Sequence, residues 1–313
     1  MTTNNDNTPV LVTIYTLVYN HEPYLRQCLE GLVMQKTNFK FKCFVHDDAS
    51  TDNSAAIIKE YVAKYPELFD VVLENENQYS KHDGSLERII EQHLEGKYIA
   101  ICEGDDYWTD PLKLQKQVDT LESNPSISLV YTGFKNVDTA GKLIGRSYYE
   151  KLCSKSPSGD ILGNLFQRNC IMTATVVYRK DIYDSKLYKD SPGFYDYSIF
   201  LSAAMLGKII FLKEKMACYR MTPGSLIVSH KKDLKPVFDQ IFVYFSKAFL
   251  DGEGFGRTFF QRFKIYGSIV LGALNNNDRL RIILKNKKLL AIYPFILFYS
   301  FAIRAWSKLN RSI

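Results

Sequence analysis

Three carboxylic acids, Glu103, Asp105 and Asp106, stand within four residues of one another, directly after an apolar run. That run, residues 97–102, has the length and composition of a buried strand, so the acids fall in the turn that ends it. Carboxylates this close repel one another unless they share a cation, and Mg²⁺ and Mn²⁺ prefer carboxylate oxygens together with substrate phosphates. The cluster predicts a divalent-cation site. The alternative is a solvated turn whose acids cap the next helix.

Asp47 and Asp48 form a second acidic pair at the end of another strand-like run, residues 40–46. Asp52 is placed to cap a helix over residues 53–64, which leaves the pair at the tip of the strand. A carboxylate there can accept a hydrogen bond from a nucleobase N–H or from a ribose hydroxyl. The pattern indicates a nucleoside site, with an ordinary turn as the alternative.

The segments around these acids alternate between the patterns of strands and helices. Strands are predicted at residues 10–16, 40–46, 69–73, 97–102 and 127–132, and helices at 23–35, 53–64, 86–94 and 111–122. Such alternation is typical of an α/β protein with a mostly parallel sheet. Ligands of these sheets bind beyond the carboxyl ends of the strands, and both acidic clusters fall at such ends.

The alternation weakens after residue 136. Residues 141–159 are predicted to be a loop-rich insertion, residues 171–178, 208–212 and 216–219 to be strands, and residues 194–206 a helix. From residue 232 the pattern is helical to the end of the chain. We place a domain boundary near Leu226, between residues 1–226, which carry the acidic clusters, and a helical extension over residues 227–313.

The composition is that of a globular protein, with 46% hydrophobic and 24% charged residues in a chain of 313. The net charge of +6 is uneven, because residues 279–313 hold eight Lys and Arg and no acid, so that residues 1–278 carry a net −2. This distribution argues against a uniformly basic nucleic-acid-binding protein. Six cysteines without a C-x-x-C pair favour small core residues in a reducing compartment over zinc ligands or disulfides.

Three motifs recur in order along the chain: Thr16 to Glu22 after the first strand, Asp47 to Asp52 after the second, and Glu103 to Asp106 after the fourth. Together they resemble the nucleotide-sugar-binding half of family-two glycosyltransferases, which are inverting enzymes of the GT-A fold, a Rossmann-like mostly parallel sheet flanked by helices. The similarity runs over residues 10–226. Residues 102–117 are similar to those of bacterial members that build surface polysaccharides.

The resemblance implies a role for each matching position on the donor side. Tyr19 would lie against a uracil ring, and Asp48 would accept a hydrogen bond from the uracil N–H. The other residues that it places at the donor are Thr16, Glu22, Asp47 and Arg88, the last of them reaching toward phosphate.

The resemblance also implies that the acid cluster holds a metal ion. Asp105 and Asp106 match the acids that bind the divalent cation, Mn²⁺ or Mg²⁺, and the ribose and diphosphate of the donor. Glu103 stands where many relatives have the first Asp of an Asp-x-Asp motif. This position is a departure, because Glu is one methylene longer than Asp.

The general base is expected at Asp196, which follows Gly193 and opens an apolar helix. An acceptor hydroxyl must lose its proton as it attacks the anomeric carbon, and a nearby carboxylate can take that proton. The family places its catalytic Asp in a similar context. The alternatives are a helix-terminal acid that interacts with the helix dipole, or a base at Asp184 or Asp190 instead.

Two cationic side chains near the boundary are further candidates. Arg220 resembles an Arg near the end of the catalytic domain of relatives, where it would contact the donor diphosphate or an acceptor phosphate. Pairing with a structural acid is the alternative. His230 follows ten residues later and is a candidate neighbour of the site.

The apolar residues 289–303 lie between basic residues and include Pro294. Fifteen residues are too few to span a bilayer, which takes about 20. An apolar segment between cations, with Trp306 at its edge, is typical of a helix lying in an anionic membrane surface. Packing on the catalytic domain or in a dimer is the alternative.

These observations predict a glycosyltransferase of the hexosyltransferase class. It would move one sugar, with inversion, from a UDP-sugar to a hydroxyl of a glycan or lipid-linked glycan, in the cytoplasm at the inner face of the cytoplasmic membrane. A nucleotidyltransferase is one alternative, but residues 16–24 lack the Gly, Lys and Arg of its usual loop. A non-catalytic nucleotide- or sugar-binding protein is the other. No P-loop, G-x-G-x-x-G or G-x-S-x-G motif is present.

Overall fold

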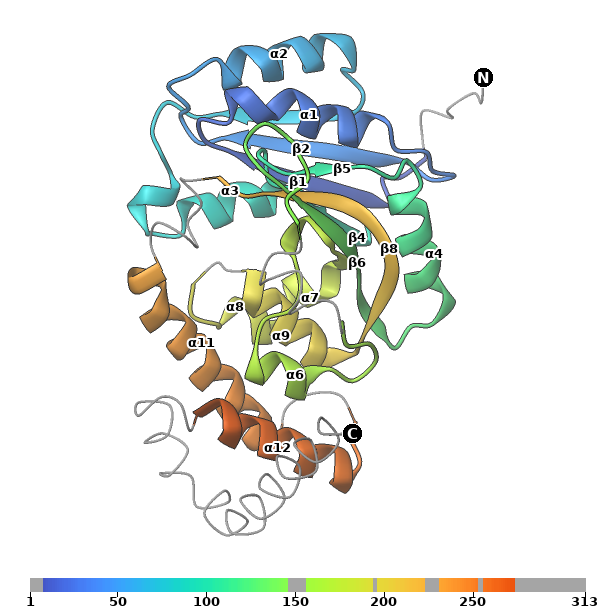
Figure 1. The fold of residues 1–313 in the computed structure, drawn as a ribbon, viewed down its shortest axis with the longest axis vertical. Helices are drawn as coiled ribbons and strands as arrows, with labels where there is room; N and C mark the ends of the chain where they lie inside the picture. Colours follow the sequence, from blue (N-terminus) through green and yellow to red (C-terminus); the bar gives the residue numbers. More distant parts are fainter. Residues whose placement is uncertain (1–7, 146–155, 194–195, 223–230, 253–255, 274–313) are drawn as a thin grey trace.

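The computed structural model describes residues 8–145, 156–193, 196–222, 231–252 and 256–273. Their centre is an eight-stranded sheet with the strand order β3-β2-β1-β4-β7-β6-β8-β5. In Figure 1, helices α1 and α2 lie above the sheet and helices α6, α9, α11 and α12 below it. The α/β architecture expected from the sequence is confirmed.

The first half of the sheet is parallel. Strand β1 pairs with β2 and β4, and β2 pairs with β3, all in the same direction. The elements of this half are β1 (Val12–Val18), α1 (Glu22–Val33), β2 (Phe41–Asp47), α2 (Ser54–Lys64), β3 (Phe69–Leu73), α3 (Ser85–His93), β4 (Tyr98–Ile101) and α4 (Lys113–Ser123). Strand β5 (Tyr107–Trp108) follows β4 in the chain but lies at the opposite edge of the sheet, antiparallel to its neighbour. Each predicted strand and helix of this half is present, and the short strand β5 was not predicted.

The second half of the sheet differs from the prediction. Its elements are β6 (Ile127–Val137), α6 (Leu162–Gln167), the 3₁₀ turn η2 (Thr173–Thr175), β7 (Val177–Arg179), α7 (Lys180–Asp184), α8 (Lys186–Lys189), α9 (Asp196–Leu206) and β8 (Lys208–Arg220). Strand β7 is antiparallel to both β4 and β6, whereas β6 and β8 are parallel.

Two predicted strand boundaries in this half were wrong. The strand predicted at 171–178 begins only at Val177, because residues 173–175 form the turn η2. The two short strands predicted at 208–212 and 216–219 are one continuous strand, β8, which absorbs residues 213–215 through register shifts against β6 at Gly133. Residues 213–215 are charged and exposed, and the bulge accommodates them without a break in the strand.

The helices after residue 230 extend the hydrophobic core formed by the preceding part of the chain. Helix α11 (Lys231–Leu250) packs on α9, and α12 (Phe259–Ala273) packs on α6. One hydrophobic core includes residues on both sides of the boundary expected near Leu226, among them Phe200, Phe245 and Ile269. Arg257 joins the two parts, since it forms an ion pair with Asp160 at 3.0 Å and donates to carbonyls at the end of α9.

The predicted membrane-surface segment, residues 289–303, lies outside the described residues, as does Cys153. Among the helices that the structure does describe, none combines the length and the apolar character needed to cross a bilayer. The other five cysteines are buried free thiols, as expected of core residues: Cys28, Cys43, Cys102, Cys170 and Cys218.

Candidate functional site

At the carboxyl edge of the sheet, hydrogen bonds between side chains and backbone N–H groups join the loops after β1 and β2. Asn20 and Ala49 adopt left-handed backbone conformations, with φ of 55° and 63°, which turn the chain sharply after each strand. The amide oxygen of Asn20 accepts from the Thr51 N–H at 2.8 Å. The carboxylate of Asp52 accepts from the Glu22 and Ser54 N–H groups, both at 2.9 Å. Asp52 therefore ties the starts of α1 and α2 together, and Asn53, not Asp52, is the N-cap residue of α2.

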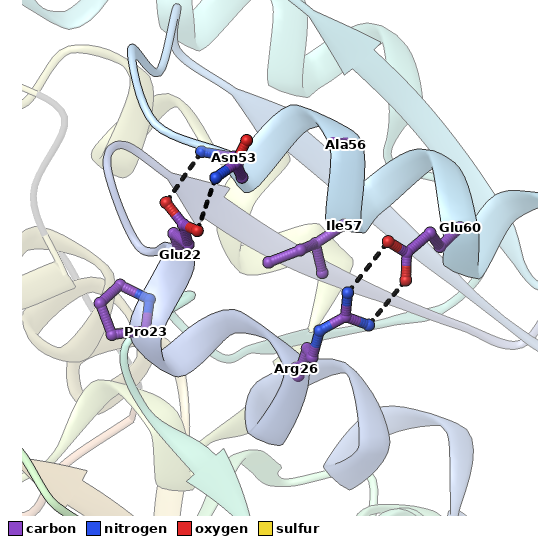
Figure 2. Close-up of a pocket in the computed structure, with 7 residues that line it drawn as sticks. All are labelled: Glu22, Pro23, Arg26, Asn53, Ala56, Ile57 and Glu60. Atoms are coloured by element: carbon purple, nitrogen blue, oxygen red, sulfur yellow. Dashed lines mark hydrogen bonds and ion pairs between the residues drawn. The ribbon is translucent and has the colours of Figure 1, made fainter.

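Glu22 has a structural partner in this arrangement. Its carboxylate accepts from the side-chain amide of Asn53 at 2.7 Å and from the Asn53 N–H at 3.1 Å, as Figure 2 shows. Further along the two helices, Arg26 of α1 and Glu60 of α2 form an ion pair at 2.7 Å, and both pairs line one hollow between the helices. The predicted donor-binding carboxylate of Glu22 is thus engaged in holding the first turns of α1 and α2 together.

The two acids at the end of β2 hold neighbouring loops. Asp47 accepts from the N–H and the hydroxyl of Ser50 in the turn that follows. The two oxygens of Asp48 accept from the backbone N–H groups of Gln78, at 2.6 Å, and of Tyr79, at 3.0 Å. Asp48 thereby fixes the loop after β3 beside the end of β1. Tyr19, at the same edge, has 49% of its surface exposed, so its ring is accessible to a flat ligand.

The turn after β4, which carries the three acids, lies closely against the end of β1. The Gly104 N–H donates to the Leu17 carbonyl at 3.0 Å, and a Cβ on Gly104 would lie 2.6 Å from Nδ1 of His21. Only glycine permits this approach. Nδ1 of His21 is buried with no hydrogen-bond partner among the described residues. His21 is therefore a site residue that the sequence analysis missed, although it stands inside the first motif.

The electrostatics of the acid turn favour a cation. Burial, followed by the charge of Asp105, raises the pKa of Glu103 to about 8. Burial and the charges of Asp105 and Glu103 raise the pKa of Asp106 well above its ordinary value. These shifts show that the negative charges oppose one another in a site with little water. Asp105 and Glu103 are partly exposed, whereas Asp106 is buried.

The acid turn is not by itself a closed metal site. Within the described ranges, no three His, Cys, Asp or Glu side chains are arranged so that they could hold a metal ion alone. A site of one or two carboxylates that is completed by substrate phosphates is the usual arrangement for Mg²⁺. The chemistry of Asp105 and Asp106 fits such an ion, and the buried, unpaired Oε2 of Glu103 lies in the same turn.

Arg220 holds the acid turn from the end of β8. Its N–H donates to the Asp106 carboxylate at 2.8 Å, and its Nε donates to the Asp105 carbonyl at 2.9 Å. The two terminal nitrogens donate to the Gln27 side chain at 2.6 Å and to the carbonyls of residues 138 and 139. Only 2% of Arg220 is exposed, and its guanidinium lies over the ring of Tyr24. The guanidinium is thus engaged by Gln27 and by main-chain carbonyls, whereas the pairing with a structural acid considered from the sequence is made only by the backbone N–H, to Asp106.

Asp196, the expected base, opens α9 and is partly buried. One carboxylate oxygen accepts from the Thr173 hydroxyl at 2.7 Å and the other from the Tyr197 N–H at 2.6 Å. Burial raises the pKa of Asp196, and these two hydrogen bonds oppose the rise. The charge of Asp196 is also a small cause of the raised pKa of Glu103, after burial and the charge of Asp105.

Two predicted residues lie apart from this group. Arg88 is exposed on α3 and donates to the Asp83 carbonyl at 3.1 Å. Thr16 is fully buried within β1, two residues before the strand ends. His230 lies outside the described residues. The acids after β2 and β4 lie at the carboxyl edge of the parallel strands, and Asp196 is joined to the turn η2 through Thr173.

Comparisons with known proteins identify the family. The model of glycosyl transferase family 2 matches residues 13–180. A protein from Mycobacterium bovis is 35% identical over 212 residues, which cover 67% of this chain and 58% of the mycobacterial protein.

Two solved structures share the fold. The S. aureus TarS fragment 1–349 in complex with UDP has a TM-score of 0.57 at 17% identity, over 91% of this chain and 77% of TarS. The mannosyltransferase PcManGT from Pyrobaculum calidifontis, in complex with GDP-Man and Mn²⁺, has a TM-score of 0.58 at 20% identity, over 98% and 85% of the two chains. The matched residues 13–180 include both acidic clusters, and the chain therefore belongs to glycosyl transferase family 2.

Proposed function

We propose that the protein transfers one sugar from a nucleotide donor, a UDP-sugar, to a hydroxyl of a glycan or lipid-linked glycan, with inversion at the anomeric carbon. The observation that carries the proposal is a pair of hydrogen bonds that link the two acidic elements: Thr173 donates to Asp196, and Trp108, two residues after Asp106, donates to the carbonyl of the neighbouring Ala174. Asp196 would then be the base, and the acids of the turn would bind the cation. A single base that activates an attacking hydroxyl opposite the leaving group gives inversion.

The nucleoside would lie at the ends of β1 and β2. The exposed ring of Tyr19 offers a stacking surface for uracil. Asp48 already accepts two backbone N–H groups, and a carboxylate retains lone pairs for a further donor such as the uracil N–H. The TarS complex with UDP supports a uracil nucleotide, whereas PcManGT, at a similar structural distance, is in complex with GDP-Man.

A divalent cation, Mn²⁺ or Mg²⁺, would be held by Asp105 and Asp106 together with the donor diphosphate. When bound, it would act as a Lewis acid that stabilises the charge of the nucleoside diphosphate leaving group. Asp196 would accept the proton of the acceptor hydroxyl. Arg220 would keep the acid turn in place for both substrates.

The acceptor would enter through a hollow of about 250 Å³ beside the base helix. Its lining includes Tyr79 and Gln78 from the loop after β3, Pro192 and Gly193 from the segment before α9, and Gln240 from α11. Aromatic and amide side chains together are suited to the faces and hydroxyls of a sugar. The basic residues 279–313 support a further proposal, that the protein works at the inner face of the cytoplasmic membrane, where a lipid-linked acceptor would be found.

Donor binding is tested by the thermal unfolding of the protein with UDP and with GDP, each with and without Mn²⁺. A ligand at 100 times its Kd stabilises the folded state by about 2.7 kcal/mol, a shift of several degrees for a chain of this size. We expect a shift with UDP that depends on Mn²⁺ and that is lost in Asp105→Asn. Asp119→Asn, an exposed acid on α4, is the matched control.

A UDP shift that is equal with and without Mn²⁺ would contradict the metal assignment, and no shift with UDP would contradict the donor class. Release of UDP from UDP-sugars, stimulated by an added glycan, then separates a transferase from a protein that only binds nucleotides. Failure of every donor and acceptor to turn over would contradict the proposed activity itself.

The acceptor proposal predicts a specific effect of Tyr79→Ala. The ring of Tyr79 is 36% exposed in the hollow, and stacking of about 1 kcal/mol corresponds to a five- to tenfold rise in KM for the glycan. KM for the donor should stay within twofold, because the backbone N–H of residue 79, which donates to Asp48, is not altered by the substitution. Tyr79→Phe should behave as the unmodified protein. A rise in donor KM with an unchanged acceptor KM would place the acceptor elsewhere.

A further inference from the structure

We propose that Thr173 is a positioning residue for Asp196, and that the indole of Trp108 sets the turn bearing Thr173 against the acid turn. The inference rests on the proposed function, since it takes Asp196 as the base. It gives Thr173 and Trp108 a role in setting the distance between the base and the donor-binding acids.

A hydrogen bond from Thr173 orients the carboxylate of Asp196. Oγ1 of Thr173 lies 2.7 Å from Oδ2 of Asp196, and Oδ1 accepts from the Tyr197 N–H. The Tyr197 bond is local and fixes only one oxygen at the start of α9. The Thr173 hydroxyl, 23 positions away in the sequence, is what sets the rotation of the carboxyl group. A carboxylate that rotates freely would present neither oxygen steadily to an acceptor hydroxyl.

The turn η2, which carries Thr173, is held by hydrogen bonds from within and from outside. Within the turn, the Thr175 hydroxyl donates to the Met172 carbonyl at 2.6 Å. From outside, the indole N–H of Trp108 donates to the Ala174 carbonyl at 2.7 Å, and the amide of Gln117 donates to the Thr175 carbonyl at 2.9 Å. Trp108 and Gln117 are buried, so these bonds are shielded from competing water.

Lys113 orients the side chain of Gln117 so that its amide NH₂ can donate to the turn. Lys113 is fully buried, lies 4.0 Å from the centre of the Trp108 ring, and donates to the Gln117 side-chain oxygen at 2.7 Å. Because Nζ of Lys113 donates to the amide oxygen of Gln117, the NH₂ of that amide faces the turn. Nζ also packs over the face of the indole whose N–H donates to Ala174.

These contacts form a continuous link between the two sides of the site. Trp108 stands two residues after Asp106, on β5, which is paired to β8 next to Arg220. From Trp108 the link passes through the Ala174 carbonyl and Thr173 to the carboxylate of Asp196. Buried hydrogen bonds therefore fix the distance between two parts of the site: the acids that would bind the donor, and the base that would activate the acceptor.

The test is a comparison of Thr173→Val with Thr173→Ser in steady-state transfer from a UDP-sugar to a glycan. Val keeps the shape of Thr but cannot donate, and a misplaced base costs up to about 100-fold in rate. We expect kcat to fall 10- to 100-fold in Thr173→Val, with both KM values within twofold, and to recover to within threefold in Thr173→Ser. Thr120→Val, which removes a hydroxyl from α4, should leave kcat unchanged.

A second variant tests the link from Trp108. Trp108→Phe keeps an aromatic ring but removes the N–H that donates to Ala174, and we expect a five- to 20-fold fall in kcat with donor affinity retained. Equal kcat in Thr173→Val and in the unmodified protein would overturn the inference while leaving the proposed function intact. Full activity of Asp196→Asn would instead overturn the proposed function, so the two failures can be told apart.

Discussion

Replacing Asp196 by Asn is expected to lower kcat by 10³-fold or more while the affinity for the donor nucleotide stays nearly unchanged. Asn retains the shape of Asp and its hydrogen bond from Thr173, but it cannot take a proton. General-base catalysis contributes about 10²- to 10⁴-fold, and no other carboxylate in the described part of the chain is hydrogen bonded to Thr173. Steady-state transfer and thermal shifts with UDP measure the two quantities.

The acids considered as competitors provide the control. Asp184 pairs with Lys180 and Asp190 pairs with Lys186 on short helices, each in an i,i+4 arrangement with partly exposed carboxylates. Exposed pairs of this kind contribute only about 0.3–0.5 kcal/mol. Asp184→Asn and Asp190→Asn should therefore retain activity. Loss of donor binding in Asp196→Asn, or loss of turnover in a competitor alone, would assign the base elsewhere.

Replacing Arg220 by Met is expected to destabilise the protein by about 3 kcal/mol, because it removes charge-assisted hydrogen bonds and leaves buried carbonyl groups unpaired. The guanidinium donates to Gln27 and to the carbonyls of Asp105 and Asp138, and it is 2% exposed. We expect Tm to fall by about 4–6 °C. Arg220→Lys should recover little of this, since a single ammonium group cannot reproduce the planar fork of donors.

The matched control is Arg88→Met on α3. Arg88 is exposed and makes one hydrogen bond to the Asp83 carbonyl, so its Tm should change by less than about 1 °C. An Arg220→Met protein that kept its Tm but lost the shift with UDP would show that Arg220 contacts the donor rather than the acid turn. That result would restore the phosphate-binding role considered from the sequence.

Local patterns were sufficient to predict the first half of the sheet. Strand β3 begins and ends at the predicted residues, Phe69 and Leu73, because a short apolar run between polar segments has few other stable arrangements. The acids at residues 47–48 and 103–106 were placed correctly at strand ends, since parallel strands bring their carboxyl ends to one edge.

Local patterns were insufficient where one segment depends on a distant one. The apolar residues 171–176 read as a strand, but Trp108 and Gln117 take up the carbonyls of the turn that they form. Helix α6 is six residues long, too short for a helical periodicity to be recognised. The bulged course of β8 is set by its pairing with β6, which no feature of residues 208–220 alone indicates.

The amino-acid sequence alone established the alternation of strands and helices, the acids at the strand ends and the candidate base. These properties follow from the spacing of residue types over a few turns or one strand. The tertiary structure established which side chains hold those acids, because the contacts join positions far apart, such as Arg220 and Asp106, which are separated by 114 residues. Such a contact depends on the order of the strands in the folded sheet, and a hydrogen-bonding side chain carries no local signal of the partner that it will meet.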